Sequence, residues 1–208
     1  MTEHLKICVL ASGRGSNFKA LAEACLDDDY PAEIALLVTD NPDAGALSTA
    51  ESLGIRSVVV DCGPKKGSMS RESSERIAAL CKENDVGLVC LAGFMRIVKG
   101  ALLDEYEGRM INIHPALLPS FKGLHGQAQA LEYGVRYSGC TVHFVDKGVD
   151  TGPIILQSVV PVEQDDTAEA LSERILREEH RIYPEAVRLI AEGKVRIEGR
   201  RVFLDYDE

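Results

Sequence analysis

Two polar residues in the second half of the sequence have the types and the spacing of a site that acts on a carbonyl group. Asn112 and His114 stand two residues apart at the end of the apolar run Met110–His114. Side chains two residues apart on a strand point to the same face of a sheet. An amide can polarise a carbonyl oxygen, and an imidazole can transfer a proton or stabilise an oxyanion. A histidine that caps a loop beside an asparagine that satisfies the backbone is the structural alternative.

A carboxylate can join this pair from the glycine-rich bend Gly148–Pro153, which contains Asp150. A negative charge beside an imidazole raises its pKa above the ordinary value of about 6.5. We therefore expect Asp150 to keep His114 charged near neutral pH. An aspartate that only shapes its own turn is the alternative.

A second candidate site is the glycine loop Ser12–Asn17, with the sequence SGRGSN, which lies between a predicted strand and a predicted helix. Glycines let the backbone approach a ligand closely, and a helix N-terminus favours an anion. Phe18 stands where the dinucleotide fingerprint GxGxxG needs its third glycine, although Asp40 could accept a ribose hydroxyl. A single phosphate is the better interpretation, and a simple strand-to-helix turn is the alternative.

The other histidines give little indication of a catalytic or metal-binding role. His143 lies inside a predicted strand, and we expect it to be structural. His125 follows a predicted loop, and its role stays open. Because no two histidines have the spacing of a zinc site, we assign no metal.

The elements that must position these residues alternate along the first half of the chain. Predicted strands are Leu5–Ala11, Glu33–Thr39, Ser57–Val60, Val86–Leu91 and Met110–His114. Predicted helices are Asn17–Leu26, Ala44–Leu53 and Ser70–Asn84. Continuous apolar runs between helices are typical of parallel strands covered on both faces. We predict an α/β fold with a doubly wound, mostly parallel sheet, whose carboxyl edge holds the ligands.

The second half adds a short helix and a different strand arrangement. We predict a helix at Gly126–Tyr133 and strands at Cys140–Val145 and Ile154–Val162, whose short connection requires an antiparallel pair. A long helix over Thr167–Glu192, interrupted near Pro184, precedes a terminal hairpin of Lys194–Ile197 and Arg201–Leu204. The absence of linkers and repeats predicts one domain over residues 1–208, with halves 1–110 and 111–208.

Composition narrows the class of protein. Of the 208 residues, 45% are hydrophobic, a fraction that predicts a folded protein. The net charge of −10 argues against nucleic acid as a partner. No run approaches the ~20 apolar residues of a membrane span, so we expect a cytoplasmic protein with no membrane partner. Its six scattered cysteines are expected to be free thiols.

Four segments resemble those of the phosphoribosylglycinamide formyltransferases, a family of folate-dependent formyltransferases: Ser12–Asn17, Leu91–Val98, Asn112–Gly126 and Gly139–Gln157. The resemblance implies the formyltransferase-like variant of the Rossmann fold. It also implies transfer of the formyl group of 10-formyltetrahydrofolate, the cosubstrate, to the amine of 5-phosphoribosylglycinamide in purine biosynthesis. Residues 1–110 would then bind the phosphate, and residues 111–208 would be the catalytic and folate-facing half.

The resemblance also assigns roles to individual residues. The catalytic ones are Asn112, His114 and Asp150. The substrate-binding ones are Gly13, Gly15, Ser16, Asn17 and Glu179. The folate-binding ones are Arg71, Met95, Arg96, Ile97, Val98 and Asn112.

Two other functions compete with this one. A formyl-folate hydrolase or a methionyl-tRNA formyltransferase would share the catalytic motifs, but we expect the first to carry a regulatory domain and the second a basic C-terminal domain. A nucleotide-binding regulatory module would use the glycine loop and Asp40, and it leaves Asn112, His114 and Asp150 unexplained. As a formyltransferase, the chain is expected to act as a monomer or a homodimer.

Overall fold

The computed structural model describes residues 4–65 and 67–205, and the chain divides into two compact units between Ile111 and Asn112. Seven of the described strands are hydrogen-bonded in the order β3-β2-β1-β4-β5-β6-β7, and two more form a separate pair, β8-β9. Strand β5 (Met110–His114) crosses the division between the units and has the predicted bounds. The predicted mostly parallel sheet with a C-terminal antiparallel pair is confirmed.

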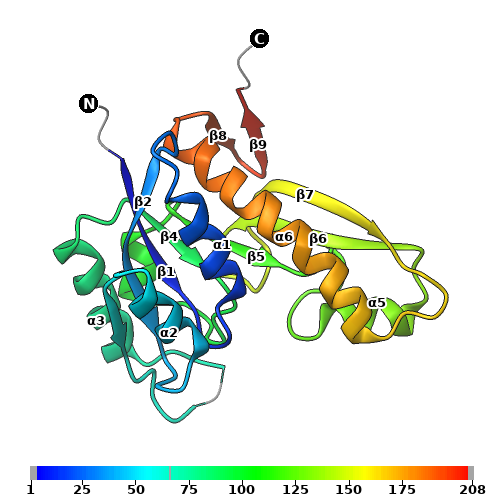
Figure 1. Ribbon diagram of the computed structural model, residues 1–208, viewed down its shortest axis with the longest axis horizontal. Coiled ribbons are helices and arrows are strands. Elements are labelled where there is room, and N and C mark those ends of the chain that lie inside the picture. Colours follow the sequence, from blue (N-terminus) through cyan, green and yellow to red (C-terminus); the bar gives the residue numbers. More distant parts are fainter. Residues whose placement is uncertain (1–3, 66, 206–208) are drawn as a thin grey trace. The chain divides into compact units, whose positions relative to one another are not determined.

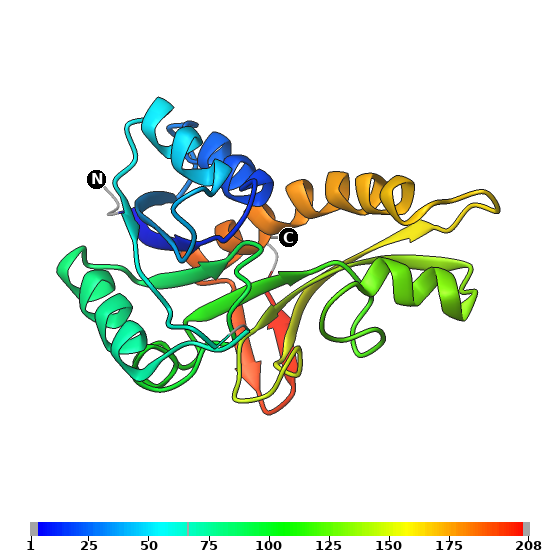
Figure 2. The ribbon, with the colours of Figure 1, turned by 90° about the horizontal axis from the view of Figure 1, so that it is seen from below.

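The first unit contains the parallel strands β1 (Leu5–Leu10), β2 (Ala32–Thr39), β3 (Ser57–Val59) and β4 (Leu88–Leu91). Its helices are α1 (Ser16–Ala24), α2 (Gly45–Ser52), α3 (Arg71–Glu83) and α4 (Ala101–Glu105). Helices α1 and α2 cover one face of these strands, and α3 and α4 cover the other (Figure 2). Residues 7–10 of the central strand β1 are therefore buried on both faces, which explains why this part of the strand is entirely apolar.

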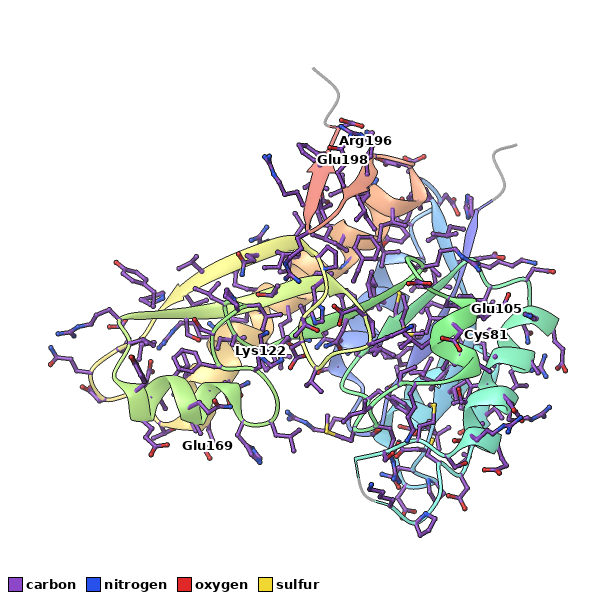
Figure 3. All side chains as sticks on the ribbon, turned by 180° about the vertical axis from the view of Figure 1, so that it is seen from behind. Cys81, Glu105, Lys122, Glu169, Arg196 and Glu198 are labelled. Carbon is purple, nitrogen blue, oxygen red and sulfur yellow. The ribbon has the colours of Figure 1, made fainter. Side chains whose placement is uncertain are left out.

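The sequence did not predict α4, which has only five residues. It is held by α3, because the Ser74 hydroxyl accepts a hydrogen bond from Leu102 N–H and donates one to the Lys99 carbonyl. An ion pair of 2.6 Å between Lys82 Nζ and Glu105 Oε2 joins the same two helices. Figure 3 labels Glu105 on α4 and Cys81 on α3.

The second unit contains α5 (Gly126–Tyr133), the antiparallel strands β6 (Tyr137–Phe144) and β7 (Ile154–Pro161), the helix α6 (Ala168–Ala191) and the hairpin of β8 (Val195–Glu198) and β9 (Arg201–Leu204). Helix α6 packs against β6, β7 and α5, and its course along the two strands is visible in Figure 1. Arg196 and Glu198 form an ion pair on β8 (Figure 3).

The predicted interruption of the last long helix is wrong. Helix α6 runs without a break from Ala168 to Ala191, with Pro184 inside it. An internal proline costs about 3 kcal/mol because it removes a hydrogen bond and crowds the preceding turn. The apolar face of α6 outweighs this cost, since Leu171, Ile175, Tyr183 and Val187 are all fully buried.

All six cysteines are free thiols, and all except Cys25 are buried. Burial raises the pKa of Cys8 well above its ordinary value, and it raises the pKa of Cys140 to about 12. No described helix is both long enough and apolar enough to span a membrane.

Candidate active site

The second unit brings the predicted catalytic residues together. Asn112 and His114 project from β5, and Asp150 lies in the loop between β6 and β7. His114 Nδ1 is 3.4 Å from Asp150 Oδ2, and both side chains are almost completely buried. Residues 36 positions apart therefore meet at the end of β5, although their catalytic roles stay predictions.

The loop that carries Asp150 is held in a defined shape. Asp150 has a φ of +50°, a left-handed conformation that non-glycine residues seldom adopt. Its Oδ2 accepts a hydrogen bond of 2.8 Å from Gly123 N–H. Asp146 Oδ1 accepts from Gly148 N–H and from the Thr151 hydroxyl, which closes the turn before and after Asp150. The strained backbone and these bonds aim the carboxylate at the imidazole.

The electrostatics of His114 differ from the expectation. Burial lowers its pKa, because a charged ring loses its hydration, and His143 adds a smaller effect in the same direction. Asp150 and the Phe121 carbonyl raise the pKa, but they do not outweigh burial. The expectation that Asp150 lifts the pKa of His114 above its ordinary value is therefore wrong, and the neutral ring is favoured in the free protein.

The carboxylate of Asp150 stays charged. Burial by itself would raise its pKa, but the nearby His143 ring, the hydrogen bond from Gly123 N–H and the positive charge available on His114 outweigh burial and bring the pKa below its ordinary value. Because Nε2 of His114 donates to the Phe121 carbonyl over 2.9 Å, Nδ1 is the ring nitrogen that faces Asp150 and can take up a proton.

His143 is a member of this cluster that the sequence interpretation missed. Its Nδ1 donates to the Phe144 carbonyl over 2.7 Å, so in the neutral ring Nε2 is an acceptor. Asn112 Nδ2 lies 3.2 Å from that Nε2, and Asp150 Oδ1 lies 3.6 Å from it. The ring therefore fixes the amide of Asn112 with its NH₂ group toward His143. The predicted antiparallel pairing of β6 and β7 could have indicated this role, because it placed residue 143 near the loop that contains Asp150.

The glycine loop lies in the first unit, at the N-terminus of α1. Gly15 has a φ of +77°, and a Cβ at this position would stand 2.6 Å from Ala46 Cβ. Only glycine therefore lets the loop turn this tightly against α2. The N-cap residue of α1 is Gly15, and no side-chain hydrogen bond caps this end of the helix. Gly13, Gly15, Ser16 and Asn17 all belong to this turn.

The predicted folate segment Met95–Val98 also lies in the first unit. Met95 and Ile97 are exposed, whereas Val98 is buried. Arg96 is engaged inside the protein: its Nε donates to Asp40 Oδ2 over 2.6 Å, and its Nη1 donates to carbonyls of the segment 63–68. Asp40, the possible ribose acceptor, is thus already bound by a guanidinium.

The two remaining predicted site residues lie in different environments. Arg71 is exposed on α3, where its Nε contacts Glu75 Oε1 at 2.7 Å. Glu179 is buried on α6. Its charge contributes to the raised pKa of Cys140 on β6. Within the described ranges, no group of three or more His, Cys, Asp or Glu residues could hold a metal ion.

Comparisons with known proteins identify the family of this chain. The formyl transferase family matches residues 5–187. Phosphoribosylglycinamide formyltransferase of Bacillus subtilis is 40% identical over 183 residues, which cover 88% of this chain and 93% of that protein. The human trifunctional purine biosynthetic protein adenosine-3 is 43% identical over 92% of this chain, which spans only 19% of that longer protein.

A comparison with solved structures also finds a close match over nearly the whole chain. The crystal structure of glycinamide ribonucleotide transformylase 1 from Symbiobacterium toebii superposes with a TM-score of 0.93 at 47% identity, covering 98% of this chain and 95% of that one. Together with the family match over most of the chain, this sequence identity shows that the proteins are homologous and do not merely share a fold. The chain belongs to the formyl transferase family.

Proposed function

We propose that this protein transfers the formyl group of 10-formyltetrahydrofolate to the primary amine of 5-phosphoribosylglycinamide, a step of purine biosynthesis. The observation that carries the proposal is the cluster of Asn112, His114, Asp150 and His143, with both histidines buried, in a member of the formyl transferase family. An amide donor, an imidazole and a charged carboxylate are the groups that a direct acyl transfer to an amine requires.

In the proposed reaction, the amine nitrogen attacks the formyl carbon and the carbonyl oxygen becomes an oxyanion. Asn112 Nδ2 carries two hydrogens, of which one is directed to His143. The other is free to stabilise the oxyanion. Loss of one such donor typically costs about 2.7–4 kcal/mol of barrier.

The proton of the attacking amine then has to reach the leaving folate nitrogen. Burial lowers the pKa of His114 and so favours its neutral ring, which can accept that proton as the oxyanion forms beside it. Asp150 stabilises the resulting imidazolium from 3.4 Å. The proton passes to the folate nitrogen as the bond between this nitrogen and the formyl carbon breaks, and no covalent enzyme intermediate forms.

The same proposal assigns the binding residues. The backbone of the glycine loop, at Gly13, Gly15, Ser16 and Asn17, would hold the phosphate, and Glu179 would face the glycinamide end. Met95–Val98 would hold the pterin through backbone groups, since the Arg96 side chain is already bound, with Arg71 on the folate side. The protein would act in the cytoplasm as one domain with a phosphate-binding half and a catalytic half, as a monomer or a homodimer.

A transfer assay tests the proposed function. Release of tetrahydrofolate from 10-formyltetrahydrofolate is followed by absorbance, with and without 5-phosphoribosylglycinamide. We expect turnover only when the amine is present. Release of formate without the amine would indicate a hydrolase, and an absence of turnover under both conditions would refute the proposed function.

A further inference from the structure

Ser12 connects two segments of the first unit to which the proposed function gives different ligands. Its hydroxyl oxygen accepts a hydrogen bond of 2.8 Å from Met95 N–H, at the start of the proposed folate segment. Its own N–H donates to the Gly93 carbonyl over 3.2 Å. Ser12 immediately precedes the phosphate-binding glycines and is itself buried. It therefore holds the glycine loop against the segment 93–95 from both its backbone and its side chain.

The loop after β2 supports Ser12 from the other side. Asn41 Nδ2 donates to the Ser12 carbonyl over 3.1 Å, and Asn41 Oδ1 accepts from Asp43 N–H. The next carbonyl along the chain, that of Gly13, accepts a hydrogen bond from Ala46 N–H. A movement of the glycine loop therefore acts directly on the hydrogen bonds that Ser12 makes.

The folate segment is fixed at its far end as well. Ile97 N–H donates to the Gly67 carbonyl, and Arg96 is bound by Asp40, the residue before Asn41. Asp40 and Asn41 thus hold the folate segment and the glycine loop respectively. The hydrogen bond from Met95 N–H to the Ser12 hydroxyl joins the folate segment directly to the glycine loop.

We propose that Ser12 couples the two binding events, so that a phosphate on the glycine loop and a pterin on Met95–Val98 each tighten the binding of the other. The inference rests on the proposed function for the identity of the ligands. The first ligand restricts the motion of the glycine loop and, through the Ser12–Met95 bond, that of the folate segment. The second ligand then has less ordering entropy to lose, and the effect is reciprocal.

The experiment measures this coupling directly with two unreactive probes. The dissociation constant of folic acid is measured by calorimetry, alone and with saturating ribose 5-phosphate, in wild-type protein and in Ser12→Ala. We expect ribose 5-phosphate to tighten folic acid binding about 5-fold or more in the wild type and less than about 2-fold in the variant. Equal coupling in both proteins, or none in the wild type, would overturn the inference.

A second readout separates coupling from simple loss of stability. Hydrogen exchange at Met95 N–H, the donor to Ser12, is expected to slow when ribose 5-phosphate binds wild-type protein. Asn41→Ala removes support from the opposite side of Ser12 and is expected to weaken the coupling even if Ser12→Ala fails to fold. Ser52→Ala removes a hydroxyl that bonds only to the Thr49 carbonyl of its own helix, and it should leave the coupling unchanged.

The outcomes also distinguish this inference from the proposed function. If neither probe binds the wild-type protein, the proposed function fails. If both probes bind but independently of each other, the function stands and the role of Ser12 is refuted. Exchange at Met95 that does not respond to ribose 5-phosphate would likewise count against Ser12 as the connection.

Discussion

Replacing Asp150 with asparagine tests the catalytic cluster with the least structural change. Asparagine tolerates the left-handed backbone that Asp150 adopts, at a φ of +50°. It also keeps an oxygen that can accept the hydrogen bond from Gly123 N–H. The substitution therefore removes mainly the negative charge beside His114 and His143.

The expected loss follows from the distance between the charges. Asp150 Oδ2 lies 3.4 Å from His114 Nδ1, which carries a positive charge once it has taken the proton of the amine. At an effective dielectric constant of about 20, unit charges this close attract each other by about 5 kcal/mol. Losing that stabilisation in the transition state lowers kcat by about 10³- to 10⁴-fold.

The assay is formyl transfer at saturating concentrations of both substrates, with folding checked by circular dichroism. Asp146→Asn is the matched control, because Asp146 lies in the same loop and its oxygen serves only to accept from Gly148 and Thr151. We expect the control to keep nearly full activity. A kcat for Asp150→Asn within about 10-fold of the wild-type value would refute the charge argument.

Three further predictions concern the surrounding residues. His143→Ala leaves the amide of Asn112 without its acceptor and should lower kcat about 10- to 100-fold with little change in KM. Rescue by His143→Gln, whose side-chain oxygen can accept a hydrogen bond, would support the conclusion that residue 143 orients the amide of Asn112. An equal loss of kcat in both variants would contradict it. Arg96→Met leaves the buried carboxylate of Asp40 without its ion-pair partner, so it should raise the folate KM and lower the free energy of unfolding in urea by about 3–5 kcal/mol. Arg56→Met, at an exposed arginine, serves as the control. An unchanged folate KM would show that the Arg96 side chain does not position the folate segment. Because burial lowers the pKa of His114 in the folded state, the unfolded chain takes up that proton first as the pH falls below about 6.5. The free energy of unfolding should therefore decrease between about pH 7 and pH 5, with Asp150 adding to the loss at lower pH, and less steeply in His114→Gln; parallel curves would refute the assignment.

The sequence predicted those parts of the fold that depend on local pattern. The predicted bounds of β5, an apolar run, and of the short helix α5 are those found in the structure. The alternation of side chains along β5 placed Asn112 and His114 on one face, and the short β6–β7 connection required an antiparallel pair. These inferences need no knowledge of distant contacts.

Features that depend on distant contacts were not predictable. The pKa of His114 is set by how much protein surrounds it, which no motif encodes. The engagement of Arg96 depends on carbonyls of the segment 63–68 and on Asp40, which lies 56 positions earlier. Pro184 remains inside α6 because the packing of a whole helix face outweighs one local penalty.

The buried thiols give the protein a set of internal reporters. Cys8, Cys81 and Cys90 lie in the core of the first unit, and Cys140 lies in the second. With pKa values raised by burial at Cys8 and Cys140, these sulfurs resist alkylating reagents until the surrounding structure opens. Pulse labelling followed by peptide mass spectrometry would thus time the opening of each unit separately, without any engineered probe.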